Sequence, residues 1–190
     1  MAKIVVTEFV SLDGVMEDPG GAEKTEYGGW TFPYWNDEIG AFKFAELVAS
    51  DAMLLGRKTY EGFAAAWPAM TDEQGFADRM NGMAKYVVSA TLDTVEWNNS
   101  HLVTGDLETE ITKLKENAPG DILVAGSASL VQSLMSLGLV DEFRLAIYPV
   151  VLGSGKRLFG AGGHTNLELV EQQATSTGVV LAVYRRTEAA

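Results

Sequence analysis

The chain has 190 residues, 47% of them hydrophobic, so it can bury one core of single-domain size. Its formal net charge of -12 argues against a nucleic-acid or anionic-membrane partner, because phosphate-bearing surfaces attract basic faces. The sequence has no cysteine, which excludes disulfides, thiolate metal sites and cysteine nucleophiles. With neither a signal-peptide pattern nor a membrane-length apolar run, we expect one cytoplasmic domain over residues 1–190.

The first half of the chain alternates strand-like and helix-like segments. Residues 3–11 are rich in β-branched residues and predict a strand, whereas residues 13–35 are rich in glycine and aromatic residues and predict a long functional loop. A helix is expected over residues 36–49, with Asn36 as its N-cap. The next predicted elements are a strand (52–55), a helix beginning at Thr59 and an irregular polar stretch (68–83).

The second half continues this alternation and then changes. Helices are expected over 108–116 and 129–137, the second ended by Gly138. The predicted strands are 85–89, 101–103, 122–125, 142–151, 167–174 and 179–186. Because the last three strands have no helix between them, the order predicts an α/β fold with a mostly parallel central sheet and a C-terminal antiparallel hairpin.

Three turns that follow predicted strands share one chemistry. They are Gly56-Arg57-Lys58-Thr59, Ser89-Ala90-Thr91 and Ala125-Gly126-Ser127-Ala128-Ser129. Ligands of parallel sheets collect outside the carboxyl ends of the strands, where free backbone N–H groups can bind phosphate oxygens. Each turn taken alone could equally be ordinary capping. Three together, with an arginine at one of them, favour a dinucleotide.

Arg57 stands near a helix start, where the helix dipole disfavours a cation. A bound anion would explain its position, and a surface ion pair with Glu61, four residues on, is the alternative.

Other fingerprints fail. The stretch GSGKRLFG (153–160) has Val150 where a P-loop needs its first glycine, and Arg157 where it needs Ser or Thr. His101 and His164 lack metal-ligand spacing, so no metal is expected. Ser127 and Ser129 have no base nearby in the sequence, which leaves nucleophilic catalysis without support.

Five segments together resemble the dihydrofolate reductase-like superfamily. "LLGRKTYE", "VVSAT" and "ILVAGSASLVQSL" are similar to the cofactor-binding turns of dihydrofolate reductases. "SLDGVM" and "LVDEFRLAIYPVVLGSGKRLF" are closer to the reductase domain of bifunctional riboflavin-biosynthesis proteins and its stand-alone relatives. The resemblance covers nearly the whole chain and implies the three-layer dihydrofolate reductase-like fold, with helices on both faces of the sheet.

The resemblance also implies NADPH as the cofactor. Arg57 and Lys58 would face its 2′-phosphate, because a guanidinium suits a bidentate contact with a dianion. The residues implied for cofactor binding are Phe9, Val10, Gly56, Arg57, Lys58, Thr59, Ser89, Ala90, Thr91, Ala125, Gly126, Ser127, Ala128, Ser129 and Leu130.

The closest resemblance implies reduction of 5-amino-6-(5-phosphoribosylamino)uracil in riboflavin biosynthesis. A dihydrofolate or pteridine reductase and a non-catalytic nucleotide-binding protein remain alternatives. Asp13 is the candidate catalytic acid, with fixing of the loop as its other role. The substrate residues are expected to be Glu8, Asp37, Glu38, Leu152 and Gly153, of which Asp37 and Glu38 stand nearest to the pterin-binding acid of dihydrofolate reductases.

A homodimer is expected from the apolar segment FRLAIYPVVL (143–152). Read as an edge of the sheet, this segment would need to be covered, and a second copy of the chain could cover it.

Overall fold

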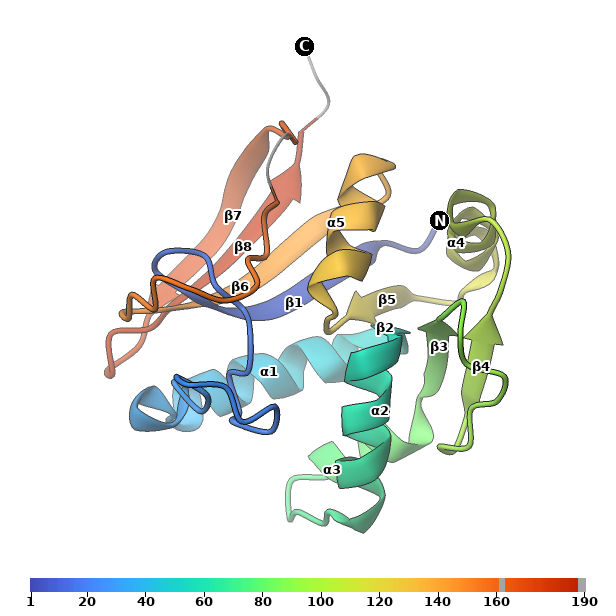
Figure 1. Cartoon of the computed structure of the whole chain (residues 1–190). Helices are drawn as coiled ribbons and strands as arrows, with labels where there is room; N and C mark the ends of the chain where they lie inside the picture. Colours follow the sequence, from blue (N-terminus) through green and yellow to red (C-terminus); the bar gives the residue numbers. More distant parts are fainter. Residues whose placement is uncertain (161–162, 188–190) are drawn as a thin grey trace.

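The structure, a computed structural model, describes residues 1–160 and 163–187 and places helices on both faces of one eight-stranded sheet (Figure 1). The strands are β1 (Ile4–Ser11), β2 (Ser50–Gly56), β3 (Ala84–Val88), β4 (Ser100–Val103), β5 (Asp121–Val124), β6 (Glu142–Tyr148), β7 (Leu167–Ala174) and β8 (Val180–Arg186). The helices are α1 (Asp37–Ala49), α2 (Arg57–Ala66), α3 (Phe76–Gly82), α4 (Leu107–Asn117) and α5 (Ala128–Ser136), with two short 3-10 turns, η1 (Phe32–Tyr34) and η2 (Trp67–Ala69).

The strand order across the sheet is β4-β3-β2-β5-β1-β6-β8-β7. The first six of these strands are parallel, whereas β8 runs antiparallel to both β6 and β7. This arrangement confirms the mostly parallel α/β fold with its C-terminal antiparallel hairpin. The expectation that residues 143–152 form an edge is wrong, because β8 returns to pair with β6 and leaves β7 as the outer strand.

Alternate side chains of the central strands enter separate cores on the two faces of the sheet. On one face Val6 packs with Val131 of α5, and α4 joins the same core. On the other face Val5 packs with Leu47 of α1 and Tyr60 of α2, beside α3. Each buried aliphatic side chain contributes about 1.5–3 kcal/mol. The two cores therefore fix β1 and β5 in the centre of the sheet.

Helix α3 arises in the stretch that was expected to be irregular. The Asp72 carboxylate accepts hydrogen bonds from the backbone N–H groups of Phe76 and Ala77, so it holds the first turn from outside the helix. Ala77 and Met80 are buried. The sequence prediction missed this helix because its seven residues are too few to show a helical period.

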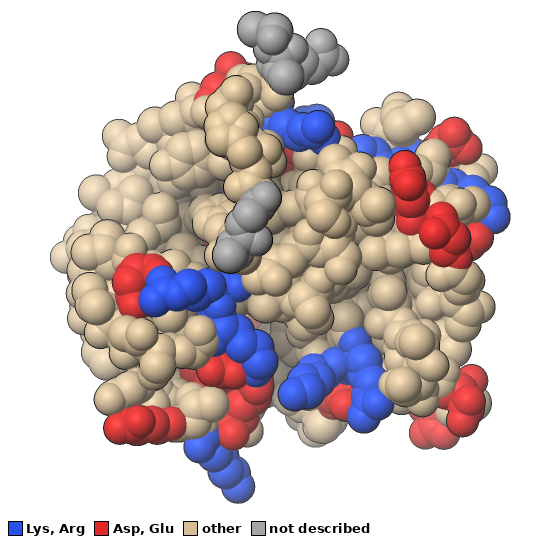
Figure 2. All heavy atoms as spheres, turned by 45° about the horizontal axis from the view of Figure 1, so that its top comes forward, with Lys and Arg blue, Asp and Glu red and all other residues tan. Residues whose placement is uncertain are grey.

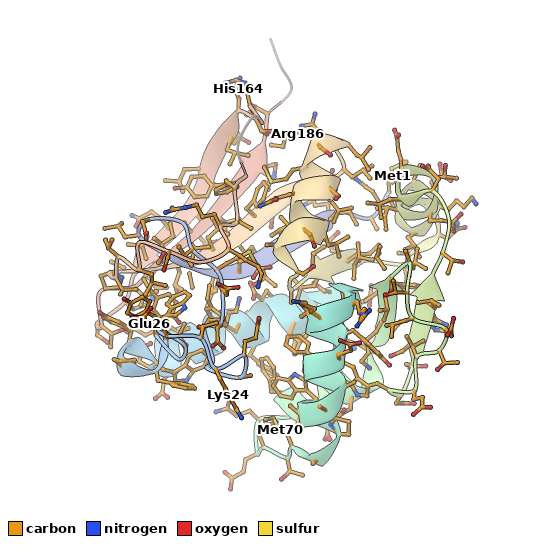
Figure 3. All side chains as sticks on the ribbon, in the orientation of Figure 1. Met1, Lys24, Glu26, Met70, His164 and Arg186 are labelled. Atoms are coloured by element: carbon orange, nitrogen blue, oxygen red, sulfur yellow. The ribbon has the colours of Figure 1, made fainter. Side chains whose placement is uncertain are left out.

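The long loop over residues 13–35 is anchored to the body of the protein near both of its ends, while residues 22–28 are exposed. The Asp18 carboxylate accepts hydrogen bonds from the backbone N–H groups of Glu23 and Thr25. Trp30 is buried, with its ring edge-on to Tyr148. Glu26 and Lys24, both labelled in Figure 3, lie on this loop near α1. Among the described residues, no helix has the length and apolar character needed to cross a bilayer.

Candidate active site

The candidate site lies at the carboxyl ends of β1, β2 and β5. The pairing of β1 with β5 ends at Val6 and Val124, while β1 continues beside β6 as far as Ser11. Glu8 therefore lies level with the turn that follows β5, and its Oε1 accepts a hydrogen bond of 2.6 Å from the Gly126 N–H. In α/β proteins ligands bind outside the carboxyl ends of the strands, and we call this region, formed by Glu8 and the turns before α2 and α5, the crevice.

The turns before α2 and α5 lie against each other in this crevice. The Gly56 N–H donates to the Gly126 carbonyl at 3.3 Å. Gly126 has a φ of +78°, and a methyl group at this position would meet the Thr59 hydroxyl. Within the described residues, the N-caps Gly56 and Ser127 make no side-chain capping bond. Two helix starts thus present free N–H groups at one place, which favours anion binding over capping.

The rest of the α5 turn divides between surface and core. The Ser127 and Ser129 hydroxyls lie 3.1 Å apart and are exposed. Ala128 and Leu130 are buried in the core on the α5 side of the sheet. Ala125 packs against the core on the opposite side, with α1 and α2. In this turn the groups that can meet a ligand are backbone N–H groups and hydroxyls.

The third turn, Ser89-Ala90-Thr91, follows β3 and leads into a loop. The Ser89 Oγ accepts hydrogen bonds from the backbone N–H groups of Thr91 (3.1 Å) and Leu92 (3.0 Å). Ordinary capping therefore accounts for Ser89, and Ala90 is exposed. The Thr91 hydroxyl accepts a hydrogen bond from Arg57.

Arg57 forms the surface ion pair considered for it and also contacts the third turn. Its Nε lies 2.9 Å from Glu61 Oε1, and one terminal nitrogen donates to the Thr91 hydroxyl at 2.7 Å. The guanidinium therefore joins the α2 turn to the β3 turn. Because its side chain is 48% exposed, the ion pair with Glu61 contributes less than about 1 kcal/mol and could give way to a bound dianion. Lys58, beside it, is also exposed.

Charge is distributed locally on the surface. Figure 2 shows Lys and Arg side chains in small groups next to acidic ones on the face it presents, without a continuous basic surface. An anion bound by a protein of net charge -12 must therefore be held by specific contacts.

Glu8 is the acid with the strongest perturbation toward the neutral form. Burial raises the pKa of Glu8 to about 8, the charge of Glu46 adds to this, and the Lys43 ammonium and the Gly126 N–H oppose it. At neutral pH this carboxyl group holds a proton inside the crevice. Perturbed acids in crevices are candidates for proton transfer.

Asp13 behaves in the opposite way. Hydrogen bonds from the Ser11 hydroxyl (2.7 Å) and the Leu152 N–H (3.1 Å) lower the pKa of Asp13 to about 2, with help from the Gly153 N–H (2.9 Å). Arg157 completes the set at 3.5 Å. At neutral pH Asp13 is therefore ionised, and its carboxylate is already bound by groups of the protein, which favours its loop-fixing role. Leu152 and Gly153, expected to meet substrate, bind this carboxylate.

Asp13 belongs to a loop clasp, which we define as residues 11–17 joined to residues 152–158. Val15 forms an isolated antiparallel bridge with Arg157, and the Glu17 carboxylate accepts the Lys156 N–H at 3.3 Å. Lys156 also forms an ion pair with Glu17. The P-loop-like GSGK stretch therefore directs its amides to carboxylates of the protein itself.

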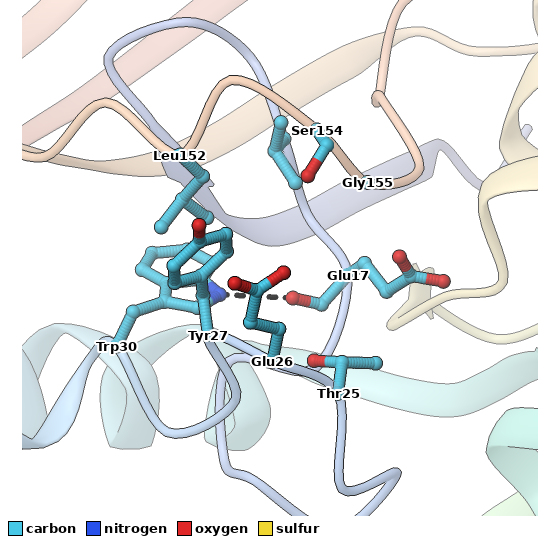
Figure 4. A pocket seen from close by; sticks show the side chains of 9 residues that line it. Glu17, Thr25, Glu26, Tyr27, Trp30, Leu152, Ser154 and Gly155 are labelled. Atoms are coloured by element: carbon cyan, nitrogen blue, oxygen red, sulfur yellow. Dashed lines mark hydrogen bonds between the residues drawn. The ribbon is translucent and has the colours of Figure 1, made fainter.

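A small pocket of about 70 Å³ lies beside this clasp (Figure 4). Its lining consists of Val15, Glu17, Thr25, Glu26, Tyr27, Trp30, Leu152, Ser154 and Gly155. The Trp30 indole N–H donates to the Glu17 carbonyl at 2.8 Å, so the wall of the pocket is hydrogen-bonded. The pocket adjoins the long loop and shares no residue with the α2 and α5 turns.

The remaining predicted residues, on β1 and at the start of α1, make other contacts. Val10 is buried in the α5-side core, whereas Phe9 points to the α1 side, packing against Trp35 and Tyr148. Glu38 accepts hydrogen bonds from Ser176 in the β7–β8 turn, which lower the pKa of Glu38. Asp37 is exposed in the first turn of α1.

Metal binding finds no support in residues 1–160 and 163–187, which contain no cluster of three potential His or carboxylate ligands. His164 lies near the end of the molecule where β8 terminates at Arg186 (Figure 3).

Sequence reasoning missed the group behind β1. Thr7 of β1 and Lys43 and Glu46 of α1 form a buried polar cluster. A signal was present, since Lys43 and Glu46 are three residues apart on the same side of a helix that has no other charged residue after its first turn.

The fold is that of the dihydrofolate reductase-like class. The family model described as the RibD C-terminal domain matches residues 2–181, and the chain belongs to this family. Two Bacillus subtilis (strain 168) relatives are uncharacterized: YyaP is 34% identical, covering 96% of this chain and 94% of its own, and YwjB is 29% identical, covering 83% and 82%.

Solved structures support the same fold. A putative riboflavin biosynthesis protein from Shewanella sp. PV-4 superposes with a TM-score of 0.79 at 21% identity, covering 99% of this chain and 100% of that one. A dihydrofolate reductase from Enterococcus faecalis, complexed with NADP(H) and RAB-propyl, superposes with a TM-score of 0.63 at 13% identity, covering 98% and 97%. At these identities the likeness establishes the fold alone.

Proposed function

We propose that this protein is an NADPH-dependent reductase of a small heterocyclic substrate. The observation that carries the proposal is the convergence of two uncapped helix starts, at Gly56 and Ser127, beside the protonated Glu8. Such a crevice suits a pyrophosphate next to a proton donor. Membership of the RibD C-terminal family and the NADP(H) complex of the Enterococcus faecalis enzyme support the same assignment.

The free N–H groups and the open backbone at Gly126 fit a dinucleotide. Bound NADPH would supply the hydride. The first turns of α2 and α5 would hold the pyrophosphate, and Arg57 with Lys58 would bind the 2′-phosphate, so we propose a preference for NADPH over NADH. Glu8 would give its proton to the substrate, while the loop clasp keeps water from the crevice.

For the substrate we propose an oxidised pyrimidine or pteridine, with 5-amino-6-(5-phosphoribosylamino)uracil first. The family and the Shewanella protein described as a putative riboflavin biosynthesis protein support this order. Dihydrofolate is the less favoured substrate. Asp37 and Glu38, which stand nearest in the sequence to the pterin-binding acid of dihydrofolate reductases, do not lie beside Glu8, and Glu8 itself holds a proton at neutral pH.

Cofactor titration followed by a substrate screen tests the proposal. NADPH is expected to bind with a change in its fluorescence, and NADH much more weakly. Oxidised heterocycles are then added and the loss of NADPH absorbance is followed. Failure to bind either nucleotide would overturn the cofactor site. Tight NADPH binding without turnover of any heterocycle would instead favour the non-catalytic alternative.

We also propose a homodimer formed through the outer strand β7. Leu169 and Val170 of this strand are 54% and 45% exposed, and the outer side of β7 has no neighbouring strand in the described chain. Apolar side chains on an open edge favour association. Sedimentation should give twice the chain mass at micromolar concentration, and Val170→Lys should give monomers; a monomeric wild type would contradict this proposal.

A further inference from the structure

A buried ion pair lies between α1 and the reverse side of β1. Lys43 Nζ is 2.6 Å from Glu46 Oε1, and their side chains are only 11% and 2% exposed. The Thr7 hydroxyl donates to Glu46 and accepts from Lys43. The Lys43 ammonium also lies 4.5 Å from the centre of the Phe9 ring. The pair is thus enclosed by charged, polar and aromatic groups.

Helix packing alone does not account for this pair. Replacing a buried ion pair with apolar side chains is often neutral or stabilising, so α1 could pack on β1 without these charges. Moreover, Glu46 Oε2 is buried and has no hydrogen-bond partner among the described residues. A half-satisfied buried carboxylate is costly. These facts suggest that the charges serve another group.

Glu8 is that group on geometric grounds. Thr7 and Phe9, the residues on either side of Glu8, both contact Lys43. Because successive residues of a strand face opposite sides, the ion pair lies directly behind Glu8 across the sheet. Charges act over longer distances in a poorly solvated interior than in water. The two charges act on Glu8 as their signs require, since Lys43 lowers the pKa of Glu8 and Glu46 raises it.

We propose that Lys43 and Glu46 are positioning residues that control the release of the Glu8 proton. Glu46 disfavours charge on Glu8 and keeps its proton in place before the reaction. When the O–H bond breaks, the proton moves to the substrate, the bonding electron pair stays on Glu8, and Lys43 with the Gly126 N–H stabilises the new carboxylate. Water later returns a proton to Glu8. The mechanistic part of this inference rests on the proposed reductase function.

Two substitutions should shift the titration midpoint of Glu8 in opposite directions. Glu46→Gln retains the size and hydrogen-bonding oxygen of the side chain but removes its charge, so the Glu8 titration midpoint should fall by about one pH unit. Lys43→Met removes the cation, so the midpoint should rise by a similar amount. The double variant should return toward wild type, because the two charges oppose each other.

Carbon-13 NMR of carboxyl-labelled protein measures this midpoint directly, with Glu8→Gln identifying the signal. A matched control exists on α4, where Glu110 and Lys113 form an exposed pair of 2.7 Å at the same three-residue spacing. Glu110→Gln and Lys113→Met should leave the Glu8 midpoint unchanged. In active protein, the pH profile of turnover should shift with the NMR midpoint.

An unchanged Glu8 midpoint in Glu46→Gln, or equal shifts in the control pair, would overturn the inference. If Lys43→Met does not fold, the direction of the shift in Glu46→Gln still decides. The NMR titration requires neither cofactor nor substrate. Opposite shifts without any turnover would therefore uphold the coupling while refuting the proposed reductase.

Discussion

Two glycine- and serine-rich turns of this protein have similar local sequences but differ in whether their backbone amides are bound by carboxylates of the protein. The turn over residues 125–129 starts α5 and leaves its first-turn N–H groups without a side-chain cap, while the stretch over residues 152–156 binds the Asp13 and Glu17 carboxylates through its amides. A turn rich in amides can bind a ligand only through the amides that the protein's own carboxyl groups leave free. In the turn over residues 125–129 Glu8 binds the Gly126 N–H, and no side chain caps the first-turn N–H groups of α5. We therefore call this turn open, whereas the loop clasp is filled.

The two acids beside these turns show the same contrast. Asp13 is held ionised by several hydrogen bonds, and its pKa falls to about 2. Glu8 receives one backbone N–H and is buried, so its pKa rises to about 8. Environments that separate the pKa values of two acids in this way assign them different roles. Glu8 can give up a proton, and Asp13 braces a loop.

Glu8→Gln tests the contrast with the largest expected effect. Because the pKa of Glu8 is about 8 in the folded state against 4.5 ordinarily, the folded state holds an extra proton between these pH values. The unfolding free energy of the wild type should therefore fall, relative to Glu8→Gln, as pH rises through this window. The difference should reach on the order of 5 kcal/mol. Urea denaturation across pH measures it, and a pH-independent difference would show that Glu8 is not perturbed.

Ser127→Asp should convert the open turn into a filled one. An aspartate at the N-cap of α5 would accept its free N–H groups, so NADPH should bind at least about 100-fold more weakly, or about 3 kcal/mol. Unfolding should show equal or higher stability, because aspartate is a good N-cap. Ser154→Asp makes the same change in the loop clasp and should leave NADPH affinity intact. Equal losses in both variants would remove the distinction between the two turns.

Arg57→Ala tests the proposed contact between Arg57 and the 2′-phosphate of NADPH. Loss of a charge-assisted contact should weaken NADPH by roughly 1.5–3 kcal/mol and leave NADH nearly unchanged. Glu61→Gln is the control, since it frees the guanidinium from its ion pair and should not weaken NADPH. Fluorescence titration of both cofactors measures this selectivity. Similar losses for NADPH and NADH would refute the 2′-phosphate assignment.

Asp13→Asn addresses the filled turn and has the smallest effect. Removing the charge that binds the Leu152 and Gly153 amides should lower the unfolding free energy by about 1 kcal/mol at neutral pH. The pKa of Asp13 is lowered from 3.8 to about 2, so its stabilisation is present above 3.8 and is lost as pH falls through 2. Thermal unfolding of both proteins should therefore converge in acid. A constant difference would place the effect outside the charge of Asp13.

Local patterns in the sequence were sufficient for the elements that depend on neighbouring residues. The strand at residues 167–174 has the predicted bounds, and Asn36 caps α1 by accepting the Ile39 N–H at 3.0 Å. The positive φ of Gly126 also agrees with a turn that needs an open backbone. Capping and strand alternation operate over a few residues, so composition and spacing reveal them.

Tertiary structure decided which of these features could act. Glu8 meets Gly126 across 118 positions of the chain, and Asp13 meets Leu152 across 139. Neither pairing leaves a signal in the neighbouring sequence. A hydrogen bond between distant residues depends on the strand order and on how far β1 extends beyond the end of β5. By itself, the sequence determined the family resemblance, the α/β pattern and the amide-rich turns. The packing of the sheet decided which turn stays open and which acid keeps its proton, since both depend on burial and on the partners brought within reach.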